Sequence, residues 1–172
     1  MFKKTVLLLF SLFISIKIMA NPSHSSTMNI LQSLFATDVQ KLNLTKAKIQ
    51  IDHIINPSFN TLAILTKLNG MATTVKNAQT SQMTDLDKLL SLSAYLYDAG
   101  FWNNNQPFLY DFNDPLGQDI NNKLLATYLN KKKGNCISMP ILYMLLAEKI
   151  GVSNVSLSTA PLHVFVQYKD QQ

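Results

Sequence analysis

The chain has 172 residues, of which 47% are hydrophobic, 15% are charged and a single one is cysteine. This hydrophobic share excludes a disordered chain, and a lone cysteine excludes an intramolecular disulfide and a cysteine-rich zinc or iron–sulfur site. All 15 basic residues are lysines, and the absence of arginine and of a basic, aromatic stripe argues against specific binding to nucleic acid.

The first 20 residues have the pattern of an export signal. Lys3 and Lys4 precede an apolar run over 6–16, and Ala20 is a small residue suited to cleavage. The run is shorter than the about 20 apolar residues of a membrane-spanning helix. We therefore expect cleavage after Ala20, with an uncleaved membrane anchor as the alternative. The mature chain would be periplasmic or secreted, without stable membrane association.

Removal of the signal also changes the charge of the chain. Three lysines leave with residues 1–20, so 12 lysines face 10 acidic residues and the net charge falls from +5 to +2. The basic character therefore belongs mainly to the signal and identifies no partner. The remainder is long enough for one domain with a hydrophobic core.

Apolar residues at helical spacing predict a largely helical mature chain. Residues 21–29 are polar and indicate a loose tail, and residues 30–55 indicate two helices with a break near Leu42 and Asn43. Further helices are expected over 59–78, where Ser58 is a candidate cap, 85–98, 120–132 and 137–150.

Local signals define the ends of several of these elements. Thr84 followed by Asp87 resembles a capping box at the start of the helix over 85–98, whose leucines, including Leu86 and Leu90, we expect to be buried. Asp119 is a candidate cap for the helix over 120–132. The segment 101–118 indicates an ordered loop, and a period of two over 152–168 predicts two strands divided near Pro161.

The only cysteine stands directly before the most apolar helix. Pro140 lacks an N–H and is tolerated in the first turn of a helix, so the helix begins near Ile137 and Cys136 lies at its N-terminus. Unpaired N–H groups and the helix dipole favour a thiolate there. Gly134 would let the backbone approach a substrate, and the N–H of Cys136 is a candidate oxyanion donor.

A nucleophilic thiol needs a base, and His163 is the best candidate because it begins the final strand. A cysteine at a helix N-terminus followed by a histidine on a later strand is the order of papain-like thiol enzymes. His53 lies in an apolar helix, where a packing role is favoured, and His24 lies in the predicted tail. The alternative is that Cys136 is a small buried apolar residue.

Several blocks between Asp85 and Tyr168 resemble the transglutaminase-like superfamily, in particular its SirB1 N-terminal type. The distinctive blocks are Gly134-Asn135-Cys136 and, in the stretch 161–166, Pro-x-His-x-Phe-Val. The other blocks that carry the resemblance are 86–89, 95–97, 100–101, 110–111, 113–116, 137–140 and 146–151.

The resemblance implies an α+β fold. A helical N-terminal part would precede a papain-like core, in which the cysteine-bearing central helix packs on a small antiparallel sheet. Two strands alone make that sheet incomplete. The implied organisation is a signal over 1–20, a tail and first helix over 21–43, and a transglutaminase-like domain over 44–172.

The resemblance also implies a triad that acts on amide or ester carbonyls of a protein or peptide. Cys136 would be the nucleophile and His163 the base. The third member normally lies on the strand after the histidine, where Asp170 is the only acid and its spacing is short. Asp111 and Asp114 could approach from the loop, although turn formation is favoured for both.

Further residues are candidates for the cleft, and two functions stay open. Asn135 and Trp102 could contribute to the oxyanion or substrate site. The aromatics of 108–112 could line the cleft together with Trp102, although core packing is favoured for all of these aromatics. A thiol hydrolase or acyltransferase is one function, and a non-catalytic or truncated module that binds a protein or peptide is the other. No metal or cofactor is implied, and the oligomeric state stays open.

Overall fold

The computed structural model describes residues 22–38 and 41–170. The predicted signal over 1–20 lies outside these ranges. None of the helices within them is both long and apolar enough to cross a membrane. The contacts divide the chain into two units between Leu42 and Asn43, and all of the elements that form the candidate site belong to the second unit.

The first unit consists of α2 (Pro22–Ala36) in its described part. The predicted loose tail over 21–29 is therefore wrong from residue 22 onward. Proline is favourable at the first helical position, because its missing N–H would have no partner there. The predicted break between two helices is confirmed, since the next helix begins only at Leu44.

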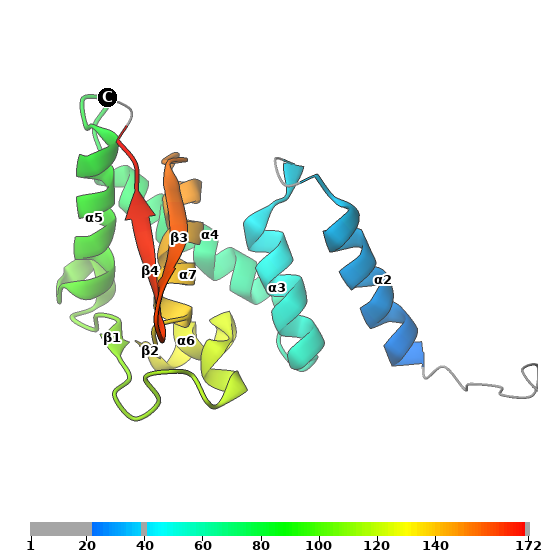
Figure 1. The fold of residues 1–172 in the computed structure, drawn as a ribbon. Coiled ribbons are helices and arrows are strands. Elements are labelled where there is room, and N and C mark those ends of the chain that lie inside the picture. The colour runs from blue at the N-terminus through cyan, green and yellow to red at the C-terminus, as the bar shows by residue number, and fades with distance from the viewer. Residues whose placement is uncertain (1–21, 39–40, 171–172) are drawn as a thin grey trace, which may run out of the picture. The chain divides into compact units, whose positions relative to one another are not determined.

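The second unit is mixed α+β, as the sequence predicted (Figure 1). Its α-helices are α3 (Leu44–Ile55), α4 (Thr61–Asn77), α5 (Asp85–Tyr97), α6 (Leu125–Lys131) and α7 (Ser138–Lys149). Two 3-10 helices, η2 (Phe101–Asn103) and η3 (Ile120–Lys123), lie in the connections. The strands are β1 (Leu109–Tyr110), β2 (Lys133–Gly134), β3 (Val155–Ala160) and β4 (His163–Tyr168).

Most helix starts follow the capping chemistry of the sequence. The predicted box at α5 is confirmed, because the Thr84 side chain accepts from the Asp87 N–H and the Asp87 carboxylate accepts from the Thr84 N–H. At α4 the cap is Asn60 and not Ser58, whose hydroxyl donates to the Asn56 side chain at 2.6 Å.

The predicted single helix over 120–132 is wrong, because η3 and α6 are separated by an extended Leu124. Asp119 caps η3 as expected, by accepting from the Asn121 N–H. The start of α6 instead relies on a distant residue, since the Leu125 N–H donates to the fully buried Asp52 carboxylate at 2.7 Å. A long-range hydrogen bond thus replaces a local cap.

The apolar helix α7 lies at the centre of the core, as its composition predicted. It packs against α4, α5 and α6 and against the strands β3 and β4. Leu142, Leu145, Leu146 and Ala147 are at most 1% exposed. The helix that carries the candidate nucleophile at its start is therefore a fixed part of the core.

The two predicted strands form an antiparallel hairpin that runs in register from the Val155–Tyr168 pair to the Ala160–His163 pair. The turn consists of Pro161 and Leu162, and Leu162 has a positive φ of 60°. This hairpin leans on α7 as expected of a sheet too small to be stable alone. A second, parallel pair, β1 with β2, was not predicted, and it sets Tyr110 beside Gly134.

Helix α5 has two apolar faces instead of the single one that was predicted. Leu89, Leu92 and Leu96 lie in the core, whereas Leu86 and Leu90 are 50% and 60% exposed. The expectation that the latter two are buried is therefore wrong. In Figure 1, β4 lies between β3 and α5, so the exposed leucines belong to the helix that borders the last strand.

Candidate functional site

The turn before α7 is held by the side chain of Asn135. Its Oδ1 accepts from the N–H groups of Ile137 and Ser138, both at 3.0 Å, and its own N–H donates to the Ser138 hydroxyl at 3.0 Å. Asn135 and Ser138 are 0% and 1% exposed. The predicted position of Cys136, just before the helix, is therefore correct, and the turn around it is rigid.

Glycine is required at position 134 for a different reason from the one expected. A Cβ at this position would lie 2.5 Å from the ring of Tyr128 and 2.8 Å from the hydroxyl of Ser138. Glycine is thus required because Tyr128 fills the space, and no room for a substrate remains on that side.

Cys136 is only 5% exposed, and both of its polar groups have partners. Its N–H donates to the carbonyl of Pro115 at 3.3 Å, and its Sγ donates to the carbonyl of Leu162 at 4.0 Å. The second contact is long and therefore weak. The sulfur faces the hairpin turn directly before His163, and the candidate oxyanion donor is already occupied by Pro115.

Tyr110, one of the aromatics of 108–112 that were candidates for the cleft, does line the cavity. Its hydroxyl donates to the same Pro115 carbonyl at 3.0 Å, so this oxygen accepts from both Tyr110 and Cys136. Burial, and then the negative charge of a thiolate at Cys136, raise the pKa of Tyr110 above its ordinary value. The phenol therefore stays a neutral donor at neutral pH.

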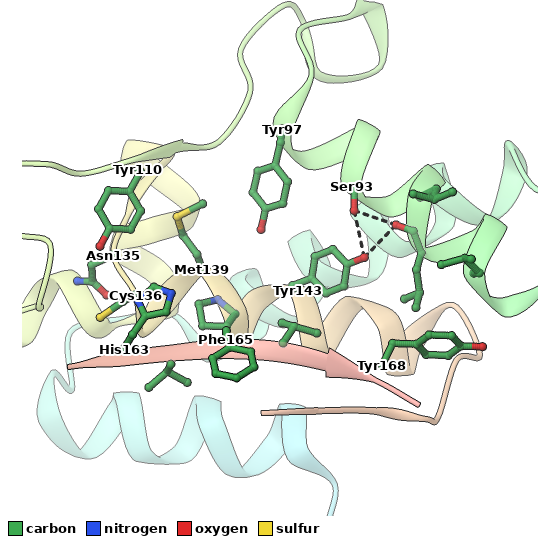
Figure 2. A pocket seen from close by; sticks show the side chains of 16 residues that line it. Ser93, Tyr97, Tyr110, Asn135, Cys136, Met139, Tyr143, His163, Phe165 and Tyr168 are labelled. Atoms are coloured by element: carbon green, nitrogen blue, oxygen red, sulfur yellow. Dashed lines mark hydrogen bonds between the residues drawn. The ribbon is translucent and has the colours of Figure 1, made fainter. Parts of the chain in front are cut away.

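His163 begins β4 and lies beside the cysteine in the same cavity (Figure 2). Its exposed ring stacks with that of Phe165 at a centroid distance of 6.5 Å. Between the described side chains of Cys136 and His163 there is no hydrogen bond. Because the imidazole is exposed, it is free to change rotamer, whereas the turn that holds the sulfur is not.

The cavity that these two residues share has a volume of about 490 Å³. It extends from Cys136 along β4 and between α5 and the first turns of α7. Its lining contains no lysine, aspartate or glutamate; it consists of Leu86, Leu89, Leu90, Ser93, Tyr97, Tyr110, Asn135, Cys136, Met139, Pro140, Tyr143, His163, Val164, Phe165, Val166 and Tyr168.

Asn135, predicted for the cleft, is among the lining residues, but its amide is engaged inside the protein. Besides accepting from the start of α7, it donates through Nδ2 to the carbonyl of Asn122 at 3.3 Å. Its role is to hold the turn, and its side chain is fully buried.

Trp102 does not line this cavity, contrary to expectation. It lines a separate one of about 370 Å³ with Phe101, Thr74 and Tyr95 among others. The reason is local, because the indole folds over Gly100, where a Cβ would lie 2.4 Å from its ring.

The three acidic candidates for the third triad member lie elsewhere. Asp170 follows the far end of β4 beside the hydroxyl of Tyr168, about 20 Å along an extended strand from His163. Asp111 accepts from the N–H of Asn113 at 3.1 Å, which is a turn contact. No acidic residue lines the described cavity that contains the imidazole.

Asp114 also forms a turn. Its carboxylate accepts from the Asn122 side chain at 2.8 Å and from the Gln118 N–H at 2.6 Å. The hydrogen bond from Asn122, followed by the backbone donors, keeps the pKa of Asp114 below its ordinary value. Asp114 thereby shapes the loop whose Pro115 carbonyl caps the N–H of Cys136.

His53 takes no part in the cavity. The Nδ1 of His53 is buried in α3 without a partner, and His53 is not among the lining residues. His24 lies in α2, in the first unit. Within the described residues, no three histidine, cysteine or acidic side chains are grouped to hold a metal ion.

A family model described as the transglutaminase-like superfamily matches residues 62–172, which include both Cys136 and His163. No curated protein and no solved structure matches the chain.

Proposed function

Because this chain belongs to the transglutaminase-like superfamily, we propose that it is a thiol enzyme that transfers or hydrolyses acyl groups at amide or ester carbonyls of a protein or peptide. The observation that carries the proposal is that Cys136 and His163 line one cavity. Family membership alone would not suffice, since a fold does not determine activity.

In the proposed reaction, the imidazole of His163 takes the proton of the Cys136 thiol and the sulfur attacks the substrate carbonyl carbon. The tetrahedral intermediate collapses when the imidazolium returns that proton to the leaving amine or alcohol, which leaves a thioester on Cys136. Water or an amine then attacks the thioester and restores the thiol. A rotamer change of the exposed imidazole brings it to the sulfur.

The intermediate needs donors for its oxyanion. The Tyr110 hydroxyl and the Cys136 N–H both donate to the carbonyl of Pro115. That oxygen therefore marks the point at which two donors converge next to the sulfur. We propose that a substrate oxyanion takes this place when the loop around Pro115 moves aside.

Export, the papain-like arrangement and the SirB1 subtype are part of the same proposal. The apolar run over 6–16 with its flanking lysines supports cleavage after Ala20 and a periplasmic or secreted protein. A reduced thiol in an oxidising compartment is also more readily understood if it has a catalytic use.

Alkylation of Cys136 by iodoacetamide tests the pairing directly. We expect His163→Ala to slow alkylation of Cys136 across the pH profile around neutrality, because the imidazole no longer takes up the thiol proton. His53→Gln is the matched control and should leave the profile unchanged. Identical profiles for wild type and His163→Ala would refute the dyad.

Non-catalytic binding of a protein or peptide in the same cavity is the second candidate function. Two observations favour it: the sulfur is almost fully covered, and no described acid orients His163. In this case a peptide ligand should protect Cys136 from alkylation, and no thioester should form with an activated ester substrate. Accumulation of a thioester, detected by intact mass spectrometry, would exclude it.

A further inference from the structure

The loop over 111–119 places one of its own carbonyls where two donors of the candidate site converge. The carbonyl oxygen of Pro115 accepts from the Cys136 N–H at 3.3 Å and from the Tyr110 hydroxyl at 3.0 Å. A carbonyl oxygen carries partial negative charge, so it satisfies donors that would otherwise be open to the oxygen of a substrate. In this arrangement an internal carbonyl stands in for the substrate, and a substrate has to displace it.

Apolar burial contributes little to holding this loop in place. Phe112 and Leu116 are 85% and 42% exposed, and Pro115 is exposed as well. Gly117 is buried, but it has no side chain. Because its apolar side chains already face water, the loop can move away from the cysteine at a low hydrophobic cost.

The carboxylate of Asp114 ties the loop to η3. Its Oδ2 accepts from the side-chain amide of Asn122 at 2.8 Å, and we call this hydrogen bond the latch. The two carboxylate oxygens also accept from the N–H groups of Gln118 and Asp119, at 2.6 Å and 3.3 Å. Since Asp114 directly precedes Pro115, an anchored carboxylate holds the neighbouring carbonyl over the Cys136 N–H.

Gly117 is a second point at which the loop meets the cysteine turn. Its φ is +64°, and a Cβ here would lie 2.8 Å from Nδ2 of Asn135 and 2.9 Å from the side chain of Lys123. Asn135 donates through the same Nδ2 to the carbonyl of Asn122. Asn122 therefore links the latch to the turn that holds the nucleophile, and a side chain at position 117 would push the loop off that turn.

We propose that the loop over 111–119 is an autoinhibitory lid: while the latch is closed, the Pro115 carbonyl blocks the donors at Cys136, and opening of the latch frees them for substrate. Asp114 and Asn122 are positioning residues of the closed state, since neither is among the residues that line the described cavity. The inference rests on the proposed function for the role of these donors, but opening of the lid can be measured on the thiol alone.

The first test compares two uncharged reagents, the small N-methylmaleimide and the bulky N-(1-pyrenyl)maleimide, on the full chain. Cys136 is the only cysteine, so intact mass spectrometry reports its modification directly. Asp114→Asn weakens the latch and should raise the rate with the bulky reagent about tenfold relative to the small one. A change in the thiol pKa would alter both rates alike, so an unchanged ratio of the two rates would overturn the lid.

Two further variants separate the latch from the charge of the loop. Asp111→Asn removes the same charge from the same loop, but the Asp111 carboxylate accepts from the nearby Asn113 N–H, so the ratio should stay within twofold of wild type. Asn122→Ala removes the donor of the latch without a change in net charge and should reproduce the effect of Asp114→Asn. Equal ratios for Asp111→Asn and Asp114→Asn would contradict the latch.

A glycine pair tests the seat of the loop. Gly117→Ala should raise the ratio of the two maleimide rates, because its Cβ collides with Asn135 and Lys123. Gly151→Ala is the matched control, since Gly151 also has a positive φ, of +91°, but faces open space. Thermal melting checks that both variants are folded at the assay temperature. A ratio that Gly117→Ala leaves unchanged would count against the lid.

Hydrogen exchange reports the blocked donor itself. In Asp114→Asn the Cys136 amide, which bonds to Pro115, should exchange about tenfold faster than in wild type. The amide of Leu145 in the middle of α7 should keep its rate. Equal acceleration at both amides would mean that the variant loosens the whole core, and would overturn the assignment of a lid.

Failure of the lid and failure of the proposed function are distinguishable. Faster modification and faster amide exchange in Asp114→Asn, with no thioester formed from an activated ester by any variant, would support the lid and contradict the enzyme. A thioester on the wild-type protein, together with unchanged modification and exchange in Asp114→Asn, would support the enzyme and overturn the lid.

Discussion

The two sides of the cavity differ in how firmly they are built. The turn over 134–138 is buried, and Asn135 and Ser138 hold it through several hydrogen bonds. The strand β4 on the other side has an exposed His163, and among the described strands it pairs with β3 alone. Under the proposed mechanism, the nucleophile is therefore held in position before substrate binds, whereas the exposed base on β4 is oriented only when substrate is present.

The largest expected effect on activity comes from substituting Cys136, in the buried turn over 134–138. Cys136→Ser should lower kcat/KM for an apolar peptide ester by about a thousandfold or more, because a hydroxyl is a far weaker nucleophile than a thiolate. The melting temperature should change little, since sulfur and oxygen differ modestly in size. Retained activity would remove Cys136 from the mechanism.

Substitution of His163, on the exposed strand β4, should give the next largest effect on activity. His163→Ala should lower kcat about 10²- to 10⁴-fold, the usual contribution of a general acid–base group. Since the ring is exposed, the free energy of unfolding should stay within about 0.5 kcal/mol of wild type. His53→Gln should leave kcat unchanged, and a similar loss in both variants would contradict the assignment of His163.

Alanine substitutions at Gly134 and Gly70 compare the tightly packed turn before α7 with an ordinary position inside a helix. Gly134→Ala should destabilise the protein by about 1–3 kcal/mol through contact with Tyr128, which lowers Tm by roughly 2–12 °C. Gly70→Ala has open space in the middle of α4 and should stabilise by about 0.5–1 kcal/mol. Calorimetry checks both, and equal shifts would contradict the packing at Gly134.

The smallest expected effect comes from the N-terminal cap of α5, the helix that carries the exposed Leu86 and Leu90. Hydrogen bonds from the Thr84 side chain, and then from its backbone, lower the pKa of Asp87 below 3.8. A carboxylate whose pKa is lower in the folded state than in the unfolded state stabilises the fold at pH values above its unfolded-state pKa. That stabilisation is lost as the pH falls through the folded-state pKa. Thr84→Ala should cost about 1 kcal/mol at pH 7.

Urea unfolding at pH 7 and at pH 2.5 measures the pH dependence. The difference in unfolding free energy between wild type and Asp87→Asn should be largest at pH 7 and smaller at pH 2.5. A difference that stays constant with pH would show that the carboxylate charge has no part in the cap.

Contacts at the cavity that sequence reasoning missed share one physical cause. Tyr110 reaches Pro115 only because β1 pairs with β2, a contact between segments more than 20 residues apart. The sequence of α5 did indicate a cavity wall, because the helix carries a second set of residues at helical spacing beside its buried leucines. These residues are Leu86, Leu90, Ser93 and Tyr97. A helix with more apolar surface than its core face needs is a candidate binding wall.

The sequence by itself determined those features that depend on neighbouring residues: the capping box of α5, the start of α7 before Pro140, and the division of the hairpin at Pro161. Only the tertiary structure decided that β1 pairs with β2 and that Asp52 starts α6. Caps and turns are hydrogen bonds among a few neighbouring residues, so the local sequence determines them. The walls of a cavity come from elements that meet only when the core is packed.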